Sequence, residues 1–273
     1  MFLAAKRIEG CSEKTLRVYE RSITKLAEAC DKLVTKITTE DIRTYLGKYQ
    51  TINDCSKVTM DNERRYISAF YSWLEEENYV IKSPCKRIHK IRASITVKEV
   101  LSDEDIEHLR DSCDIERDLA MVDFLYSTGI RVGELVELDI SDINFEEREC
   151  IVHGKGDKER RVYFDAKTKI HLKKYLDSRT DDNPALFVTL RSPFKRLKTG
   201  GVETRIREMG ERLDINKVHP HKFRRSMATR AIDKGMPVEQ LQKILGHEQI
   251  DTTMRYAMVS QSNVKASHKK FMS

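Results

Sequence analysis

The sequence predicts a mainly α-helical chain with a small antiparallel β-sheet, an α+β protein of two domains. Apolar residues recur at three- and four-residue spacing over most of the chain, as in amphipathic helices. One segment instead alternates apolar and polar residues around two glycines, which is typical of a β-hairpin. The 273 residues are enough for two compact units, each with its own core.

Residues 1–88 are expected to form a small helical bundle. The segment SEKTLRVYERSITKLAEAC begins with Ser12 as a candidate N-cap. Its apolar residues then lie on one helical face: Leu16, Tyr19, Ile23 and Leu26. TTEDIRTYLGKYQ and VTMDNERRYISAFYSWLEEENYV repeat this pattern, each after a start that contains threonine.

Residues 89–98 are expected to be a basic linker to the second domain. From residue 81 to residue 98 the chain has no acid and six cations: Lys82, Lys86, Arg87, Lys90, Arg92 and Lys98. Residues 1–92 contain 18 Lys and Arg against 13 Asp and Glu, a net charge of +5, whereas the remainder, with 32 against 31, has +1. A solvated charge run is the commoner explanation of such a segment. A linker that lies along a polyanion is the alternative, because neutralised phosphates release counterions.

Residues 99–273 are expected to form a second domain, mostly helical with the small sheet. VLSDEDIEHLRDSC opens with Ser102 as an N-cap and has acids in its first turn. ERDLAMVDFLYSTGIRVGELVEL predicts an apolar helix that is interrupted at Thr128-Gly129 and resumes after Arg131. ECIVHGKGDKERRVYFD predicts the hairpin. Four helical segments follow: IHLKKYLDSR, GGVETRIREMGERL, HKFRRSMATRAIDKG and PVEQLQKILG, the last with Pro237 in its first turn and Gly246 just past its end.

Composition and motifs exclude several classes of protein. No apolar run reaches the roughly 18 residues of a membrane span, and the start MFLAAKRIEG does not resemble a secretory signal, which predicts a cytoplasmic protein with no membrane partner. The six cysteines are scattered without a Cys-x-x-Cys pair, so neither zinc nor a disulfide framework is expected. The chain has no acidic cluster at metal-binding spacing and no Walker-type loop, which gives metal-dependent nucleases and NTPases little support.

Six polar side chains of the second domain carry the functional hypothesis: Arg131, Lys155, His221, Arg224, His247 and Tyr256. Taken singly, each has an ordinary explanation as a surface, turn, helix-end or core residue. Together they are the groups that a pentacoordinate phosphoryl transition state would use. Arginine clamps non-bridging oxygens, histidine and lysine exchange protons with the attacking and leaving oxygens, and a phenol can attack phosphorus to form a phosphotyrosine.

The chain resembles the tyrosine recombinases, the family of the phage integrases and the Xer proteins. Five segments match the active-site boxes of that family in order and in separation: TGIRVGEL (128–135), GKGDKER (154–160), HKFRRSMATR (221–230), LGH (245–247) and TTMRYAMV (252–259). The helical N-terminal part is similar to the core-binding domain of the family, so the resemblance covers essentially the whole chain. After Arg224 many relatives continue His-Thr where this chain has Arg225-Ser226, a position that flanks the site.

The resemblance assigns a role to each of the six residues. The arginines, Arg131 and Arg224, bind the scissile phosphate. Lys155 protonates the leaving 5′-oxygen, and Tyr256 is the nucleophile. The two histidines assist through proton transfer and hydrogen bonding, and Glu134 supports the site.

The resemblance also implies partners. The two domains would form a C-shaped clamp on double-stranded DNA, and four cations at the domain junction would contact it: Lys86, Arg87, Lys90 and Arg92. No cofactor is needed, because the phosphotyrosine bond keeps the energy of the broken phosphodiester. A homotetramer would exchange strands through a Holliday junction, with the C-terminal segment VSQSNVKASHKKF of each protomer docked on a neighbour. An accessory directionality factor is a further possible partner.

The resemblance leaves the biological task open. The TTMRYAMV and ATRAIDKG segments are more similar to integrases of mobile elements in Gram-positive bacteria, which favours integration and excision. Xer-type chromosome dimer resolution is the alternative, and type IB topoisomerase-like relaxation or DNA binding without catalysis are readings from other classes. Residue 1 lies almost at the first core-binding helix, so either a short recombinase or a trimmed version of a longer one is expected.

Overall fold

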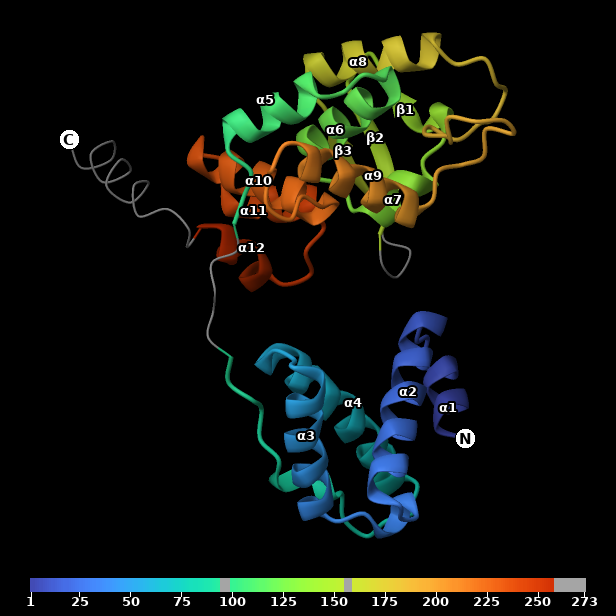
Figure 1. Ribbon diagram of the computed structural model, residues 1–273, viewed down its shortest axis with the longest axis vertical. Helices are drawn as coiled ribbons and strands as arrows, with labels where there is room; N and C mark the ends of the chain where they lie inside the picture. The colour runs from blue at the N-terminus through green and yellow to red at the C-terminus, as the bar shows by residue number, and fades with distance from the viewer. Residues whose placement is uncertain (94–98, 155–158, 258–273) are drawn as a thin grey trace, which may run out of the picture. The chain divides into compact units, whose positions relative to one another are not determined.

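The computed structural model describes residues 1–93, 99–154 and 159–257. The chain divides into two compact units, Met1–Thr96 and Val97–Ser273. The elements of both units are shown in Figure 1. In the described ranges no helix has both the length and the apolar character that crossing a membrane requires. The predicted mainly helical architecture with a small antiparallel sheet is confirmed.

Among residues 1–93, the first unit has four α-helices and two short 3-10 helices: α1 (Phe2–Ile8), α2 (Glu13–Cys30), η1 (Val34–Lys36), α3 (Thr39–Asn53), α4 (Lys57–Glu76) and η2 (Pro84–Arg87). Ser12 caps α2 as predicted, because its side chain accepts a hydrogen bond from the backbone N–H of Thr15 at 3.3 Å. Helix α1 was not predicted, since seven residues are too few to show a helical period. It is held by Phe2, whose ring packs edge-on against Phe70 at 5.2 Å between ring centroids.

The second unit contains eight α-helices, one 3-10 helix and three strands in the described residues. Its helices are α5 (Asp103–Asp111), α6 (Glu116–Thr128), α7 (Val132–Glu137), η3 (Ile140–Asp142), α8 (Ala166–Asp177), α9 (Thr199–Arg212), α10 (Pro220–Asp233), α11 (Val238–Leu245) and α12 (Ile250–Ala257). The strands β1 (Ile143–Asn144), β2 (Glu149–His153) and β3 (Glu159–Tyr163) form an antiparallel sheet in that order. Strands β2 and β3 are the predicted hairpin, with Cys150 opposite Val162.

Helix α6 is the centre of the second unit. It packs against α8 and α10 (Figure 1), and five of its apolar residues are buried in one large core: Ala120, Met121, Val122, Phe124 and Leu125. The helix ends where the sequence predicts, at Thr128, because Gly129 adopts the left-handed conformation with φ of 60°. The chain re-enters a helix after Arg131, which is therefore fixed between two rigid elements.

Helix α11 begins one residue later than the sequence predicts. Pro237 is its N-cap, with φ of −57° and ψ of 139°, rather than a residue of the first turn. Gly246 ends the helix as predicted, in the left-handed conformation with φ of 61°. Helix α12 follows after a short connection and packs against both α10 and α11.

Candidate active site

Arg131 and Glu134 form a reciprocal cap at the start of α7. The Glu134 carboxylate accepts a hydrogen bond from the backbone N–H of Arg131 and another from its Nη1, both at 2.8 Å. Because Glu134 is three residues into the helix, its carboxylate also lies at the positive end of the helix dipole. The Arg131 side chain is one-third exposed, so this cap holds a guanidinium that still reaches solvent.

Arg160, on strand β3, holds the same carboxylate from the other side. Its Nη1 and Nη2 donate to the two oxygens of Glu134 at 2.6 and 2.7 Å. Burial by itself would raise the pKa of the Glu134 carboxyl. The hydrogen bonds from Arg160 and from Arg131 outweigh burial and hold this pKa below its usual value. Glu134 is therefore a permanent anion at neutral pH that fixes two guanidinium groups.

Three arginines meet at the C-terminal end of α11. Arg160 Nε donates to the carbonyl of Ile244 at 2.8 Å. Arg224 Nη2 donates to the carbonyl of Leu245 at 2.5 Å, and Arg131 Nη2 donates to that of Gly246 at 3.2 Å. The last carbonyls of a helix have no partner within the helix and carry its negative dipole, so they are suitable acceptors for cations. The LGH segment thus gathers guanidinium groups from β3, α10 and the start of α7.

Two glycines permit this arrangement. Gly129 ends α6, and its carbonyl accepts a second hydrogen bond from Arg224, from Nη1 at 2.7 Å. A Cβ at Gly129 would lie 2.1 Å from Cε of Met227, and a Cβ at Gly246 would lie 2.7 Å from Cδ of Arg160. Both positions have the positive φ that glycine adopts without strain, so the predicted helix breaks are also contact points of the site.

Arg224 is the most buried cation of the group, with 4% of its surface exposed. Burial, together with the like charges of Arg131 and Arg160, lowers its pKa to about 10, so the guanidinium remains charged at neutral pH. Among the described residues, the carboxylate that contacts these three guanidiniums is that of Glu134, which neutralises one of their three positive charges. The cluster keeps an excess of positive charge, which suits it to bind an anion such as a phosphate.

His247 is held as a neutral ring beside Arg224. Arg224 Nη2 lies 3.1 Å from His247 Nε2, and a guanidinium can only donate, so Nε2 is the acceptor. The hydrogen is therefore on Nδ1, which donates to Oγ1 of the buried Thr253 at 2.8 Å. Burial, then the charges of Arg224, Arg131 and Arg160, lower the pKa of His247 to about 4.

Tyr256 is brought to this histidine by helix α12. The two rings are nearly parallel, with an interplanar angle of 22° and 6.1 Å between centroids. Tyr256 is half-buried and packs against the small apolar cluster of Ala228, Leu241 and Leu245. The structure therefore connects the predicted nucleophile, through His247, to the buried arginine of the site.

His221 is in the first turn of α10, after the N-cap His219 and the first helical residue Pro220. The side chain is exposed, but desolvation by neighbouring protein atoms, followed by the positive charges of Arg224, Arg131 and Arg225, lowers the pKa of the His221 ring. His221 is therefore neutral at pH 7 and can accept a proton.

Lys155 lies outside the described residues, as does the predicted C-terminal helix VSQSNVKASHKKF, and only the strands that flank Lys155 are described.

The cations predicted to contact DNA from the end of the first unit are all exposed: Lys86, Arg87, Lys90 and Arg92. Lys86 differs from the prediction in one respect, because its ammonium is paired with Glu75 on α4. A paired lysine has less charge to offer to a phosphate.

Two features of functional interest were missed by the sequence analysis. Arg160 is the last residue of the GKGDKER segment (154–160) and was given no role, although it shares the inward face of β3 with the buried Val162. A charged residue on the buried face of a strand needs a partner. The position of Arg160 two residues before the buried Val162 was the signal for this in the sequence.

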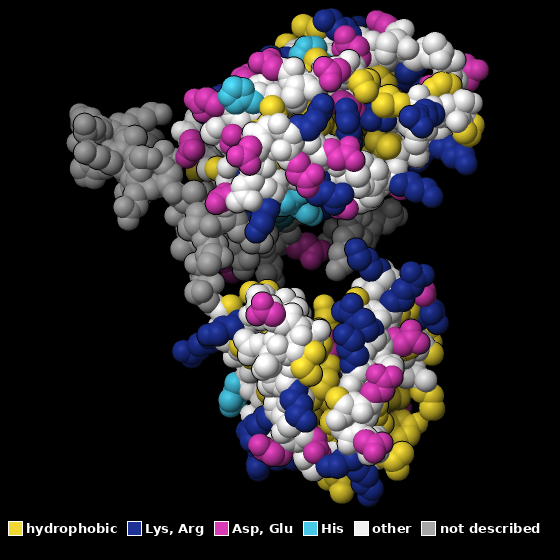
Figure 2. All heavy atoms as spheres, viewed as in Figure 1, with side chains coloured by type: hydrophobic (Ala, Val, Ile, Leu, Met, Phe, Trp, Pro, Cys, Tyr) yellow, Lys and Arg dark blue, Asp and Glu magenta, His cyan; other side chains and the backbone are white. Residues whose placement is uncertain are grey.

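The second missed feature is a row of cations on α2. Lys14, Arg17, Arg21 and Lys25 recur at three- and four-residue spacing, which places them on one face of the helix. The first three are exposed, and the Lys25 ammonium lies 5.4 Å from the ring centroid of Tyr49. Figure 2 shows Lys and Arg side chains gathered over α2. The spacing is visible in the sequence and would have been sufficient to find this row.

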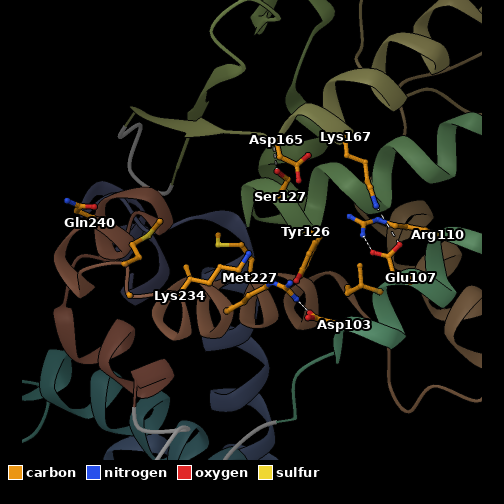
Figure 3. Close-up of a pocket in the computed structure, with 15 residues that line it drawn as sticks. Asp103, Glu107, Arg110, Tyr126, Ser127, Asp165, Lys167, Met227, Lys234 and Gln240 are labelled. Carbon is orange, nitrogen blue, oxygen red and sulfur yellow. Dashed lines mark hydrogen bonds and ion pairs between the residues drawn. The ribbon is translucent and has the colours of Figure 1, made fainter. Parts of the chain in front are cut away.

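A pocket of about 790 Å³ opens between α5, α6, α10 and α11 (Figure 3). None of the predicted site residues lines it. Its charged groups are largely paired with one another, as in the ion pairs of Arg110 with Glu107 and of Arg230 with Asp103. This pocket is therefore distinct from the arginine cluster.

Comparisons with known proteins show the family of the chain. The model of the phage integrase family matches residues 99–263, and the model of the phage integrase N-terminal SAM-like domain matches residues 1–81. Tyrosine recombinase XerC of Oceanobacillus iheyensis is 31% identical over 249 residues, which cover 87% of this chain and 81% of the relative. Tyrosine recombinase XerA of Pyrococcus furiosus is 30% identical over 268 residues, with 97% and 90% covered.

Solved structures show the same fold. A crystal structure of XerA recombinase is 28% identical with a TM-score of 0.58, over 98% of this chain and 95% of the other. The Tn1549 transposon integrase in complex with transposon right end DNA is 18% identical with a TM-score of 0.79, over 99% and 98%. XerH bound to palindromic difH substrate is 20% identical with a TM-score of 0.79, over 98% and 83%. The chain is a tyrosine recombinase: it belongs to the phage integrase family, whose enzymes carry out site-specific DNA recombination.

Proposed function

We propose that this enzyme cleaves and rejoins DNA strands at a specific site through a 3′-phosphotyrosine intermediate, with no cofactor. One observation carries the proposal: Arg131, Arg160 and Arg224 converge on the last carbonyls of α11, and His247 next to them stacks on Tyr256. The proposal therefore places a phosphate bound by the arginines near Tyr256, the candidate nucleophile on α12.

The arginines bind and polarise the scissile phosphate. A guanidinium has five N–H donors, more than Arg131 or Arg224 uses in its described contacts. The remaining donors of both are available to the non-bridging oxygens, where they stabilise the charge of the pentacoordinate transition state. Glu134 and Arg160 hold Arg131 in place and do not themselves need to contact the DNA.

The chemical step transfers the phosphoryl group to tyrosine. The Tyr256 oxygen loses its proton to the neutral ring of His221 and forms a bond to phosphorus. The bond from phosphorus to the 5′-oxygen breaks, and that oxygen takes a proton from Lys155. His247, neutral in this structure, contributes a hydrogen bond rather than a proton. Attack by a 5′-hydroxyl reverses the step and reseals a strand.

We further propose that four protomers act on two duplexes through a Holliday junction and exchange their C-terminal segments. The proposed task is the integration and excision of a mobile element, with an accessory directionality factor as a possible partner. The TTMRYAMV and ATRAIDKG segments, which resemble those of mobile-element integrases, support this task. Identity of 30–31% with recombinases named XerC and XerA favours a second candidate, chromosome dimer resolution.

The test is to trap the covalent intermediate. The protein is incubated, without added metal, with a labelled pool of nicked duplexes of random sequence, and DNA that stays attached after denaturation is sequenced. We expect an adduct whose DNA shares one cleavage site and which is absent in Tyr256→Phe. The Phe variant must still bind that DNA with wild-type affinity. If no adduct forms although the DNA is bound, the proposal is wrong and DNA binding without catalysis is supported. An adduct that comes with relaxation of supercoiled DNA, without site pairing, would support a topoisomerase instead.

A further inference from the structure

One face of α10 connects His221 to the packing site of Tyr256. Four residues recur along it at four- and three-residue spacing and therefore share this face: His221, Arg225, Ala228 and Ile232. Ala228 and Ile232 belong to the apolar cluster against which Tyr256 packs, and α10 packs against α12. Arg225 thus lies between the two groups that the proposed reaction uses to move the phenol proton.

Arg225 has no partner of the kind that fixes the other arginines of the site. Its Nε is inaccessible to solvent and has no hydrogen-bond partner among the described residues. The guanidiniums of Arg131, Arg160 and Arg224 all donate to carbonyls at the end of α11. A buried N–H without an acceptor is destabilising, so the unpaired Nε of Arg225 requires an explanation.

The electrostatics of α10 agree with this placement. Burial lowers the pKa of Arg225, and the charges of Tyr256 and Glu99 act in the opposite direction. Arg225 is also one of the cations that lower the pKa of His221. Its charge is therefore within electrostatic range of both His221 and the Tyr256 oxygen.

We propose that the guanidinium of Arg225 stabilises the negative charge that develops on the oxygen of Tyr256 during cleavage. The inference rests on the proposed function and adds a residue to it. In the step, the O–H bond of Tyr256 breaks and its proton passes to His221. The oxygen lone pair forms the bond to phosphorus, the bond to the 5′-oxygen breaks, and that oxygen takes the proton of Lys155. A cation within electrostatic range of the phenol oxygen makes this loss of a proton easier at neutral pH.

The test is the pH dependence of adduct formation under single-turnover conditions. The substrate is the nicked duplex recovered in the trapping experiment, at saturating enzyme, between pH 6 and pH 10. We expect Arg225→Gln to be slower than the wild type by about 100- to 1,000-fold at pH 7, as for other donors to a developing oxyanion. Its rate should continue to rise with pH and approach the wild-type rate in alkali. Arg225→Lys, which keeps the charge, should retain most of the rate.

Matched controls separate this role from a structural one. Arg207→Gln removes the same charge from the exposed side of α9 and should leave the profile unchanged. A defect in Arg225→Gln that is the same at every pH would mean damage to the fold or to the arginine cluster and would overturn the proposal. DNA affinity is measured in the Tyr256→Phe background, where adding Arg225→Gln should not weaken it. Weaker affinity with an unchanged rate at saturation would make Arg225 a DNA contact instead.

A modified substrate shows whether Arg225 assists the loss of the Tyr256 proton or the departure of the 5′-oxygen. Sulfur in place of the bridging 5′-oxygen gives a leaving group that departs without a proton. This substrate should rescue Lys155→Ala but not Arg225→Gln, and rescue of both would contradict the proposal. If the wild type forms no adduct on any duplex, the proposed function itself is wrong and this inference falls with it.

Discussion

Arg160 holds the carboxylate of Glu134 through both ends of its guanidinium, at 2.6 and 2.7 Å, and the two residues come from different elements of the fold. Glu134 is on α7 and Arg160 is on β3, and the same carboxylate also caps the helix that begins after Arg131. The pair therefore couples the sheet to the helix start that presents Arg131, the arginine proposed to bind the scissile phosphate. Its loss should affect both stability and chemistry.

We expect Glu134→Gln to lower the free energy of unfolding by about 3 to 5 kcal/mol, as when one member of a buried ion pair is removed. Single-turnover cleavage should fall as well, because Arg131 loses an anchor. Urea denaturation at pH 7 measures the first effect. Glu147→Gln, on the exposed turn before β2, is the control and should change stability by less than about 0.5 kcal/mol. Equal stability of the two variants would refute the structural role of the pair.

The same variant has a predicted pH signature. The folded state holds the pKa of Glu134 below its unfolded value, so its contribution is present above the unfolded pKa of about 4.3 and is lost as pH falls through the folded pKa. The stability difference between the wild type and Glu134→Gln should be constant from pH 7 to about pH 5 and shrink at lower pH. A difference that grows in acid would show that another group is responsible.

The helix-ending glycines provide a second prediction. Gly246→Ala should cost more than the roughly 1 kcal/mol of a left-handed alanine, because its Cβ would also displace the Arg160 side chain. Gly235→Ala is a matched control: φ is 90° there, and a Cβ would meet nothing within 4 Å. Thermal unfolding should rank Gly246→Ala below Gly235→Ala, and only Gly246→Ala should slow cleavage. Equal effects would mean that contact with Arg160 is unimportant.

Much of the fold follows from local signals in the sequence. Ser12 and Ser102 cap the helices that they were predicted to cap, and Gly129 and Gly246 end helices where predicted. These features depend on short stretches of chain, in which the side chain itself supplies the hydrogen bond or the conformation. Helix α1 was missed because it owes its position to tertiary packing of Phe2 rather than to a period.

The site was less accessible to sequence reasoning. Arg131, Arg224, His247 and Tyr256 were selected for their combined chemistry and given roles by a resemblance, but no spacing in the sequence indicates that three arginines meet at one helix end. That arrangement depends on contacts between distant parts of the chain, because Arg160 and Ile244 are 84 positions apart and Arg131 and Gly246 are 115 positions apart. Long-range packing of this kind is not written in any local pattern.

His247 provides a pH-dependent prediction of stability. Its pKa is about 4 in the folded state, below the value of about 6.5 for an exposed histidine. Between these values the unfolded chain binds a proton that the folded protein does not, so stability is full above pH 6.5 and falls as pH drops towards 4. In His247→Gln this part of the decline should be absent, as measured by thermal unfolding from pH 7 to pH 4. The exposed His89→Gln should retain the wild-type slope.

The cation row on α2 gives a prediction about DNA binding that separates it from the domain junction. Arg17 and Arg21 are exposed at four-residue spacing, whereas Lys86 is paired with Glu75. We expect the double variant Arg17→Gln, Arg21→Gln to weaken binding and to reduce the slope of log affinity against log salt by about 0.9 for each lost phosphate contact. Lys86→Gln should change the slope by much less, because its charge is already partly neutralised. A larger effect of Lys86→Gln than of the α2 variant would instead place the phosphate contacts at the domain junction. Filter binding to the duplex recovered in the trapping experiment, measured between 50 and 200 mM salt, distinguishes phosphate contacts on α2 from contacts made by Lys86. Specific base contacts change affinity without changing this slope.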